Sequence, residues 1–195
     1  MTGNEIGLSA SRLGHTVGGR FMCGIVGIAG RFEQAELKCL NNALTHRGPD
    51  DAGEYFAPAG SPGLAMSRLA IVDLAEGKQP MANADGSVVL VFNGEIFNAP
   101  ELRKQLEAKG AKFTTDHSDT EVILRLYEAE GPSMLPKLNG MFALVVHDVA
   151  RGQLFGARDR FGIKPFYYHQ NVERFAFASE LKALLQLPGY SLEVE

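Results

Sequence analysis

The sequence has few cysteines, no excess of basic charge and no long apolar run. Only Cys23 and Cys39 occur among 195 residues, too few for a disulfide framework, so we expect reduced thiols and a cytoplasmic setting. The 19 lysines and arginines are outnumbered by 23 aspartates and glutamates, which gives no support to nucleic-acid binding through a basic face. No apolar run approaches the roughly 20 residues of a membrane span. We therefore expect a globular protein with neither nucleic acid nor membrane as a partner.

Residues 1–22 differ in composition from the rest of the chain. They are rich in glycine and serine, show no helix or strand period, and lack the apolar core of a secretory signal. A transit peptide is a weaker alternative. We expect 1–22 to be a leader or propeptide, disordered or removed, and 23–195 to be a single domain.

Apolar strands at hairpin spacing dominate that domain, with two or three helices grouped between them. This order favours an α+β fold with antiparallel sheets over alternating βαβ units. Strands are predicted at 23–30, 54–57, 63–73, 87–94, 141–149, 153–157, 166–169 and 175–179. Helices are predicted at 33–45, at 100–109, from the Ser118–Glu121 capping box to Gly131, and at 180–187.

Cys23 is the candidate nucleophile. A cysteine reacts as its thiolate and needs a nearby base at neutral pH. Its own α-amine, with an ordinary pKa of about 7.7–8.0, would serve if Cys23 were the first residue. That requires either translation from Met22 with loss of the methionine, or removal of a propeptide. The residue type alone favours a buried strand hydrophobe, and we expect Cys39 on the apolar side of its helix.

Nine motifs together resemble one family, the class II glutamine amidotransferase domain, an N-terminal-nucleophile (Ntn) hydrolase. The closest likeness is to the glutaminase domain of glutamine-hydrolysing asparagine synthetase. The motifs are MCGIVGIAG (22–30), HRGPDD (46–51), SRLAIVD (67–73), QPM (79–81), FNGEIFN (92–98), SDTEVIL (118–124), LNGMFAL (138–144), ARDRFGIKPFYY (157–168) and FASELKALL (177–185). Their order and number make chance similarity very improbable.

The resemblance implies a four-layer αββα sandwich of two antiparallel sheets. It also implies hydrolysis of the glutamine side-chain amide to glutamate and ammonia through a γ-glutamyl thioester on Cys23. The side chain of Asn93 and the backbone N–H of Gly94 would form the oxyanion hole, where loss of one donor typically costs about 2.7–4 kcal/mol. The alternative for this Asn-Gly pair is a tight turn.

The same resemblance implies the substrate pocket. Arg68 would clamp the α-carboxylate of glutamine, since a guanidinium matches a carboxylate with two parallel bonds. Leu69, Ile71 and Val72 would line the pocket. The alternative for Arg68 is a surface side chain on a strand.

Glu95 and Asp119 would bind the α-ammonium of glutamine, although Asp119 also suits the first turn of a helix. Arg47 is expected to order a loop that covers the substrate. We interpret His46 as structural, and the segment 157–165 receives no catalytic role.

The resemblance covers only part of a larger enzyme. The Ser-Gly-Gly-x-Asp-Ser phosphate loop of the family's synthetase domain does not occur in this sequence. ATP and magnesium are therefore expected only in a synthetase domain or separate subunit, with no metal or cofactor in this domain. The ammonia acceptor stays open, with asparagine formation favoured, and so does a homodimer. Two further alternatives are a non-enzymatic module that binds glutamine or a partner because Cys23 is not freed, and an Ntn peptidase.

Overall fold

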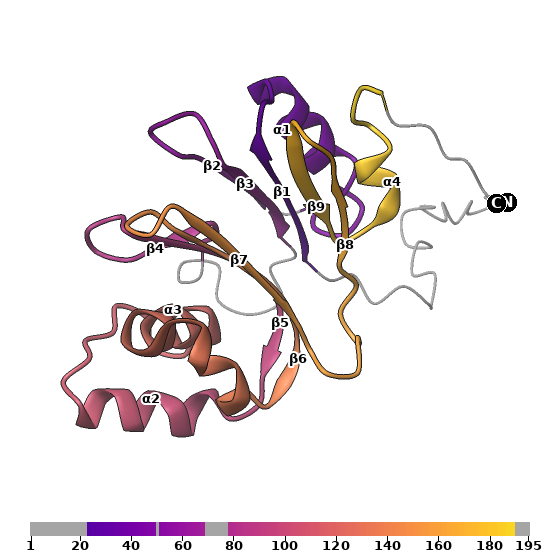
Figure 1. The fold of residues 1–195 in the computed structure, drawn as a ribbon. Coiled ribbons are helices and arrows are strands. Elements are labelled where there is room, and N and C mark those ends of the chain that lie inside the picture. The colour runs from indigo at the N-terminus through magenta and orange to yellow at the C-terminus, as the bar shows by residue number, and fades with distance from the viewer. Residues whose placement is uncertain (1–22, 50, 69–77, 190–195) are drawn as a thin grey trace, which may run out of the picture.

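Two antiparallel sheets form the centre of the molecule (Figure 1). The computed structural model describes residues 23–49, 51–68 and 78–189. One sheet has the strand order β2-β3-β1-β9-β8 and the other the order β4-β5-β6-β7. The strands are β1 (Gly24–Gly30), β2 (Asp51–Phe56), β3 (Gly63–Arg68), β4 (Met81–Ala82), β5 (Val88–Ile96), β6 (Gly140–Asp148), β7 (Gln153–Arg158), β8 (Tyr167–Gln170) and β9 (Arg174–Ala178).

Helices cover the outer face of each sheet, as Figure 1 shows. The helices α1 (Gln34–Asn42) and α4 (Leu181–Leu184) pack on the five-stranded sheet. The helices α2 (Ala99–Ala108) and α3 (Asp119–Glu130) pack on the four-stranded sheet, and a 3-10 helix (Gly131–Lys137) follows α3. The predicted αββα sandwich is confirmed. No helix in the described ranges is both long enough and apolar enough to cross a membrane.

A separate apolar layer fills the space between the two sheets. Successive side chains of a strand point to opposite faces, so alternate residues of β1, β3 and β5 contribute to this layer. Its buried members are Ile25, Leu64, Met66, Val89, Val91, Ala143, Val145 and Phe177. The intervening residues face the helices instead, which explains why the central strands are apolar throughout.

The first and last strands of the domain are direct neighbours. Strand β1 pairs with β9 in the register Val26↔Ala178. Just beyond β9, the Ser179 backbone N–H donates to the Ile25 carbonyl at 2.9 Å, and the Ile25 N–H donates to the Ser179 hydroxyl at 3.0 Å. The segment after Cys23 is therefore fixed by residues from the other end of the described chain.

Two local predictions are wrong. Cys39 is exposed, because the buried face of α1 is made by Leu37, Leu40 and Asn41. The capping box at α3 is only half formed: the Ser118 hydroxyl accepts the Glu121 N–H, but the buried Glu121 carboxylate does not return the bond. That carboxylate instead accepts hydrogen bonds from five donor groups: the backbone N–H and hydroxyl groups of Thr114 and Thr115 in the preceding loop, and Arg125 in the next turn of α3.

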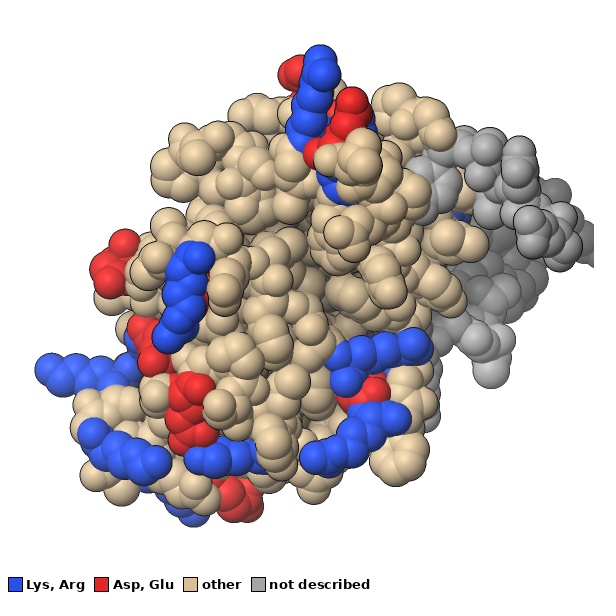
Figure 2. Space-filling model, viewed as in Figure 1, with Lys and Arg blue, Asp and Glu red and all other residues tan. Residues whose placement is uncertain are grey.

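Charges of both signs are mixed on the surface seen in Figure 2, where lysines and arginines lie beside aspartates and glutamates. This agrees with the formal net charge of −4. The visible face therefore offers no continuous basic track for a polyanion.

Candidate active site

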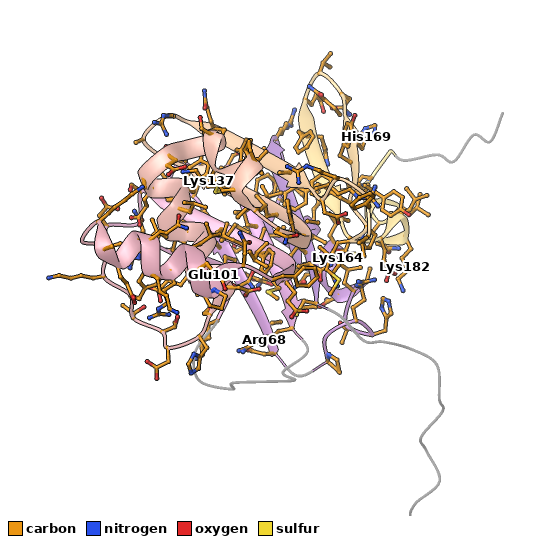
Figure 3. The ribbon with its side chains drawn as sticks, turned by 90° about the horizontal axis from the view of Figure 1, so that it is seen from below. Arg68, Glu101, Lys137, Lys164, His169 and Lys182 are labelled. Atoms are coloured by element: carbon orange, nitrogen blue, oxygen red, sulfur yellow. The ribbon has the colours of Figure 1, made fainter. Side chains whose placement is uncertain are left out.

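The candidate residues meet at one end of the sandwich, between the sheets. Cys23 directly precedes β1 and packs against the inter-sheet layer. Arg68 ends the neighbouring strand β3 and shares the face of Leu64 and Met66, which point into that layer. Figure 3 looks onto the molecule from below and labels Arg68 at the end of its strand. The antiparallel pairing Gly24↔Ser67 thus brings the start of β1 to the end of β3.

Asn93 comes from the opposite sheet and belongs to the same layer. It lies on β5 at the same parity as the inward-facing Val89 and Val91, and it is only 2% exposed. Its Nδ2 atom is buried and has no hydrogen-bond acceptor among the described residues. A buried donor left unpaired costs about 1–3 kcal/mol, so this amide is a natural binding group for a ligand oxygen.

The Asn93-Gly94 pair is not a tight turn. Strand β5 continues through both residues to Ile96, in the register Gly94↔Phe142 with β6. The strand prediction, which ended at Gly94, was two residues short. Asn93 is therefore held in an extended strand by its pairing with Ala143 of β6, which fixes the direction of its side chain.

The backbone of β5 presents N–H groups along its other edge. The Phe92 N–H donates to Gln79 Oε1 at 2.6 Å, and the Ile96 N–H donates to Asp119 Oδ2 at 3.1 Å. Alternate residues of a strand point their N–H groups the same way, so the Gly94 N–H is directed to this edge between those two. The geometry is compatible with the predicted oxyanion hole, in which Gly94 would donate beside the Asn93 amide.

Asp119 joins the site from the start of α3. Burial raises the pKa of its carboxyl group, the hydrogen bonds from the backbone N–H groups of Ile96 and Thr120 act against this, and the negative charge of Glu95 raises it further. Two carboxylates close together in a partly desolvated site favour a bound cation. This agrees with the prediction that Glu95 and Asp119 meet an α-ammonium group.

Arg47 links the candidate nucleophile Cys23 to the start of α4. Its Nε donates to the Cys23 carbonyl oxygen at 3.3 Å, and its Nη1 lies 2.8 Å from Glu180 Oε1. This arginine, together with His46 and Lys182, lowers the pKa of Glu180 to about 2, although burial of the carboxylate acts in the opposite direction. The loop-gating role of Arg47 remains a prediction, whereas its hydrogen bond to the Cys23 carbonyl is part of the structure.

Three predicted pocket residues, Leu69, Ile71 and Val72, lie outside the described residues. So does Met22, whose bond to Cys23 decides whether the α-amine exists. The roles of Cys23, Arg68 and the pocket residues therefore remain predictions.

Sequence reasoning missed the contribution of the loop after β7. Asp159 is buried, and its carboxylate accepts backbone N–H bonds from Phe142, Phe161, Ile163 and Lys164. These bonds hold the pKa of Asp159 below its usual range, even though its burial is the largest single influence and opposes them. The ARDRFGIKP motif was visible in the sequence, but nothing in its spacing indicated that one carboxylate organises the whole loop.

Metal ligands do not gather anywhere in the described ranges, where no three His, Cys, Asp or Glu side chains form a group that could hold an ion. The chemistry of the site is that of a thiol, amide donors, carboxylates and guanidinium groups.

The family model of the glutamine amidotransferase domain matches residues 22–195. The chain therefore belongs to this family. This glutamine amidotransferase domain is 43% identical over 171 residues to a Bacillus subtilis protein named asparagine synthetase [glutamine-hydrolyzing] 1, covering 84% of the chain and 27% of the relative. It is 41% identical to a putative asparagine synthetase [glutamine-hydrolyzing] 2 of Methanocaldococcus jannaschii, covering 84% of the chain and 35% of the relative.

The domain thus spans about a quarter to a third of the length of these relatives. Among solved structures, it is similar to glutamine phosphoribosylpyrophosphate amidotransferase of B. subtilis, with a TM-score of 0.68 and 25% identity. That match covers 83% of this chain and 43% of the other. The names of the sequence relatives favour a hydrolytic domain over a non-enzymatic binding module.

Proposed function

We propose that this domain hydrolyses the side-chain amide of L-glutamine to glutamate and ammonia, and supplies the ammonia to an ATP-dependent amidation such as asparagine synthesis. The observation that carries the proposal is the buried Nδ2 of Asn93, which lies in the inter-sheet layer against which Cys23 packs and has no acceptor among the described residues. The names of the sequence relatives support the choice of glutamine.

Each proposed step uses a group at this end of the sandwich. The Cys23 sulfur attacks the amide carbon, and its proton passes to the α-amine of Cys23, which requires a chain that begins at this residue. Asn93 and Gly94 stabilise the oxyanion, ammonia leaves with the transferred proton, and water releases glutamate from the thioester. Arg68 binds the α-carboxylate, while Glu95 and Asp119 bind the α-ammonium.

The amidation partner completes the proposal. ATP and magnesium would belong to a synthetase domain or separate subunit that activates the acceptor acid, and this domain would contribute ammonia alone. A cytoplasmic setting fits the requirement for a reduced nucleophile, and both Cys23 and Cys39 are unpaired.

The test is glutamate release from glutamine, without ATP, by protein whose first residue is Cys23 as verified by intact mass. We expect Cys23→Ala to abolish release and Asn93→Ala to lower kcat by about 10²–10³-fold, the usual effect of removing one oxyanion donor. Cys39→Ala is the matched control, because Cys39 is exposed on α1, and its activity should equal that of the parent. Equal rates for the parent and Cys23→Ala would refute the proposal.

A further inference from the structure

Strand β5 has an edge near the candidate site that no described strand covers. Strand β4 pairs with β5 only as far as Leu90. Beyond it, the N–H groups of Phe92 and Ile96 point to the same edge, because alternate residues of a strand direct their N–H groups the same way. Gln79 Oε1 accepts the Phe92 N–H, and Asp119 Oδ2 accepts the Ile96 N–H. Two side chains therefore stand where a neighbouring strand would otherwise pair.

Gln79 joins this edge of β5 to the first turn of α3. Its Oε1 accepts the Phe92 N–H at 2.6 Å, and its Nε2 donates to Thr120 Oγ1 at 3.2 Å. Thr120 is buried and directly follows Asp119 in the first turn of the helix. One side-chain amide thus fixes the distance between the strand and the helix turn that carries Asp119.

The backbone of Gln79 is held by the other sheet. A Cβ added to Gly53 of β2 would lie 1.8 Å from the Gln79 carbonyl oxygen and 2.8 Å from its carbonyl carbon. Only a glycine at position 53 allows the two backbones to approach so closely. Gln79 therefore contacts three elements, β2 through its backbone and both β5 and α3 through its side chain.

The predicted oxyanion donor lies between the two groups that Gln79 and Asp119 bind. The N–H of Gly94 is directed to the same edge of β5, between the N–H groups of Phe92 and Ile96. Glutamine would place its amide oxygen at Gly94 and its α-ammonium at Asp119. The separation of these two binding groups must therefore match the length of the glutamine side chain, and a misplacement of about 1 Å can cost about 10²-fold in rate.

We propose that Gln79 is a positioning residue that sets the separation between the Gly94 N–H and the Asp119 carboxylate. The inference rests on the proposed function. Gln79 takes no part in the bond changes and acts through the strand and the helix that it connects. Its bond to Phe92 holds β5, and its bond to Thr120 holds the first turn of α3, so that glutamine meets both binding groups at once.

Asn83 offers a matched control, because it makes the same kind of connection at the other end of β4. Its Oδ1 accepts the Val88 N–H at 3.0 Å, and its Nδ2 donates to Glu128 Oε1 of α3 at 2.8 Å. Val88 begins β5, about 20 Å along an extended strand from Gly94. Loss of either amide should weaken the contact between β5 and α3, but only loss of Gln79 should disturb the site.

The experiment compares the kinetics of Gln79→Met and Asn83→Leu in protein whose first residue is Cys23. We expect Gln79→Met to lower kcat/KM for glutamine about 10²-fold, the usual effect of a small misplacement at the reacting groups. The loss should appear both as a lower kcat and as a higher KM, because the oxyanion donor and the ammonium-binding carboxylate shift relative to each other. Asn83→Leu should leave both constants unchanged.

The rise in KM separates a positioning role from a structural one. Partial unfolding lowers the amount of active protein, and hence the apparent kcat, but leaves KM as it is. An unchanged KM in Gln79→Met, or equal losses in Gln79→Met and Asn83→Leu, would overturn the inference. Circular dichroism verifies folding. If Gln79→Met does not fold, Thr120→Val, which breaks only the bond to α3, decides the question by the same criteria.

Hydrogen exchange of the full chain tests the same connection without glutamine. The Ile96 N–H bonds Asp119 and not Gln79, so it should exchange faster in Gln79→Met because the start of α3 is no longer held against β5. Asn83→Leu should leave its exchange at the parent rate. An unchanged rate at Ile96 in Gln79→Met would overturn the inference.

Failure of this inference is distinguishable from failure of the proposed function, since hydrogen exchange needs no turnover. Parent-like kinetics of Gln79→Met in a protein that hydrolyses glutamine would remove only the role of Gln79. Faster exchange of Ile96 in Gln79→Met, in a protein that releases no glutamate, would support the positioning of Asp119 by Gln79 and remove the glutaminase.

Discussion

Replacing Asp159 with asparagine should destabilise the domain strongly, although the two side chains have the same shape. Each carboxylate oxygen accepts two backbone N–H groups: Oδ1 those of Phe161 and Ile163, and Oδ2 those of Phe142 and Lys164. An amide retains one oxygen, so two bonds are lost in either orientation and its NH₂ group faces two donors. Hydrogen bonds to charged groups contribute about 1.5–3 kcal/mol each, which gives about 3–6 kcal/mol for two.

We expect the lower part of that range, about 3 kcal/mol, because the exposed Phe161 side of the loop can shift toward water. Urea unfolding followed by circular dichroism measures the difference. The matched control is Asp85→Asn: Asp85 is exposed and accepts the Ser87 N–H at 2.9 Å, a bond that asparagine can also accept. Its effect should stay within about 0.5 kcal/mol.

The difference should also depend on pH in a defined direction. The folded pKa of Asp159 lies below its usual value, so its stabilisation is present above about pH 4 and is lost as the pH falls through the folded pKa. The difference in the free energy of unfolding between the parent and Asp159→Asn should therefore become smaller as the pH is lowered. A gap below about 1 kcal/mol at pH 7, or one that stays constant down to pH 3, would refute the reasoning.

Two other changes test the sheets. In Gly94→Ala the added Cβ would lie 2.8 Å from the Phe142 Cα and would push β5 away from β6, so we expect a loss of at least about 1–3 kcal/mol in urea unfolding together with loss of glutamate release. Gly156→Ala, whose Cβ would have its nearest neighbour at 3.6 Å, should leave both nearly unchanged, and similar losses in the two variants would contradict the steric argument. Burial lowers the pKa of His147 in the folded protein. As the pH falls, this histidine is therefore protonated in the unfolded chain before it is protonated in the folded one. The free energy of unfolding should fall from pH 7 to pH 5 by up to about 1.4 kcal/mol per pH unit. The free energy of unfolding of His147→Gln should depend less steeply on pH. Replacing the exposed His117 by glutamine should leave the pH dependence of the parent unchanged.

Much of the fold could be predicted because local signals and tertiary packing agree. Leu37 and Leu40 lie one helical turn apart and face the sheet, and Gly131, with a φ of 60°, ends α3 where the sequence indicated. The strands follow the apolar runs because both faces of the central strands are buried.

The failures arise where a tertiary contact decides between local alternatives. Asn-Gly is usual in turns, yet at Asn93 pairing with β6 on one side keeps the chain extended. Cys39 is apolar by residue type, but its angular position on α1 turns it to water. Glu121 has the spacing of a capping residue, but its carboxylate accepts hydrogen bonds from the threonines of the preceding loop instead of from the backbone N–H of Ser118.

For the candidate site, the residue types were predictable and their arrangement was not. The resemblance supplied Arg68, Asn93 and Asp119, but only the alternation of side chains on β3 and β5 brings the first two to one layer. The burial of Lys164 could not be predicted, because it depends on a loop conformation that the carboxylate of Asp159 sets.

The pairing of β1 with β9 has a consequence for synthesis on the ribosome. The strand that follows Cys23 can pair with β3 early, but it lacks its second neighbour until Ala178 and Ser179 have emerged, since Ser179 bonds Ile25 across a sequence separation of 154. A nascent chain therefore carries Cys23 next to an unfinished sheet until β9 has been made. The surroundings of Cys23 are thus completed only by a strand that is synthesised much later.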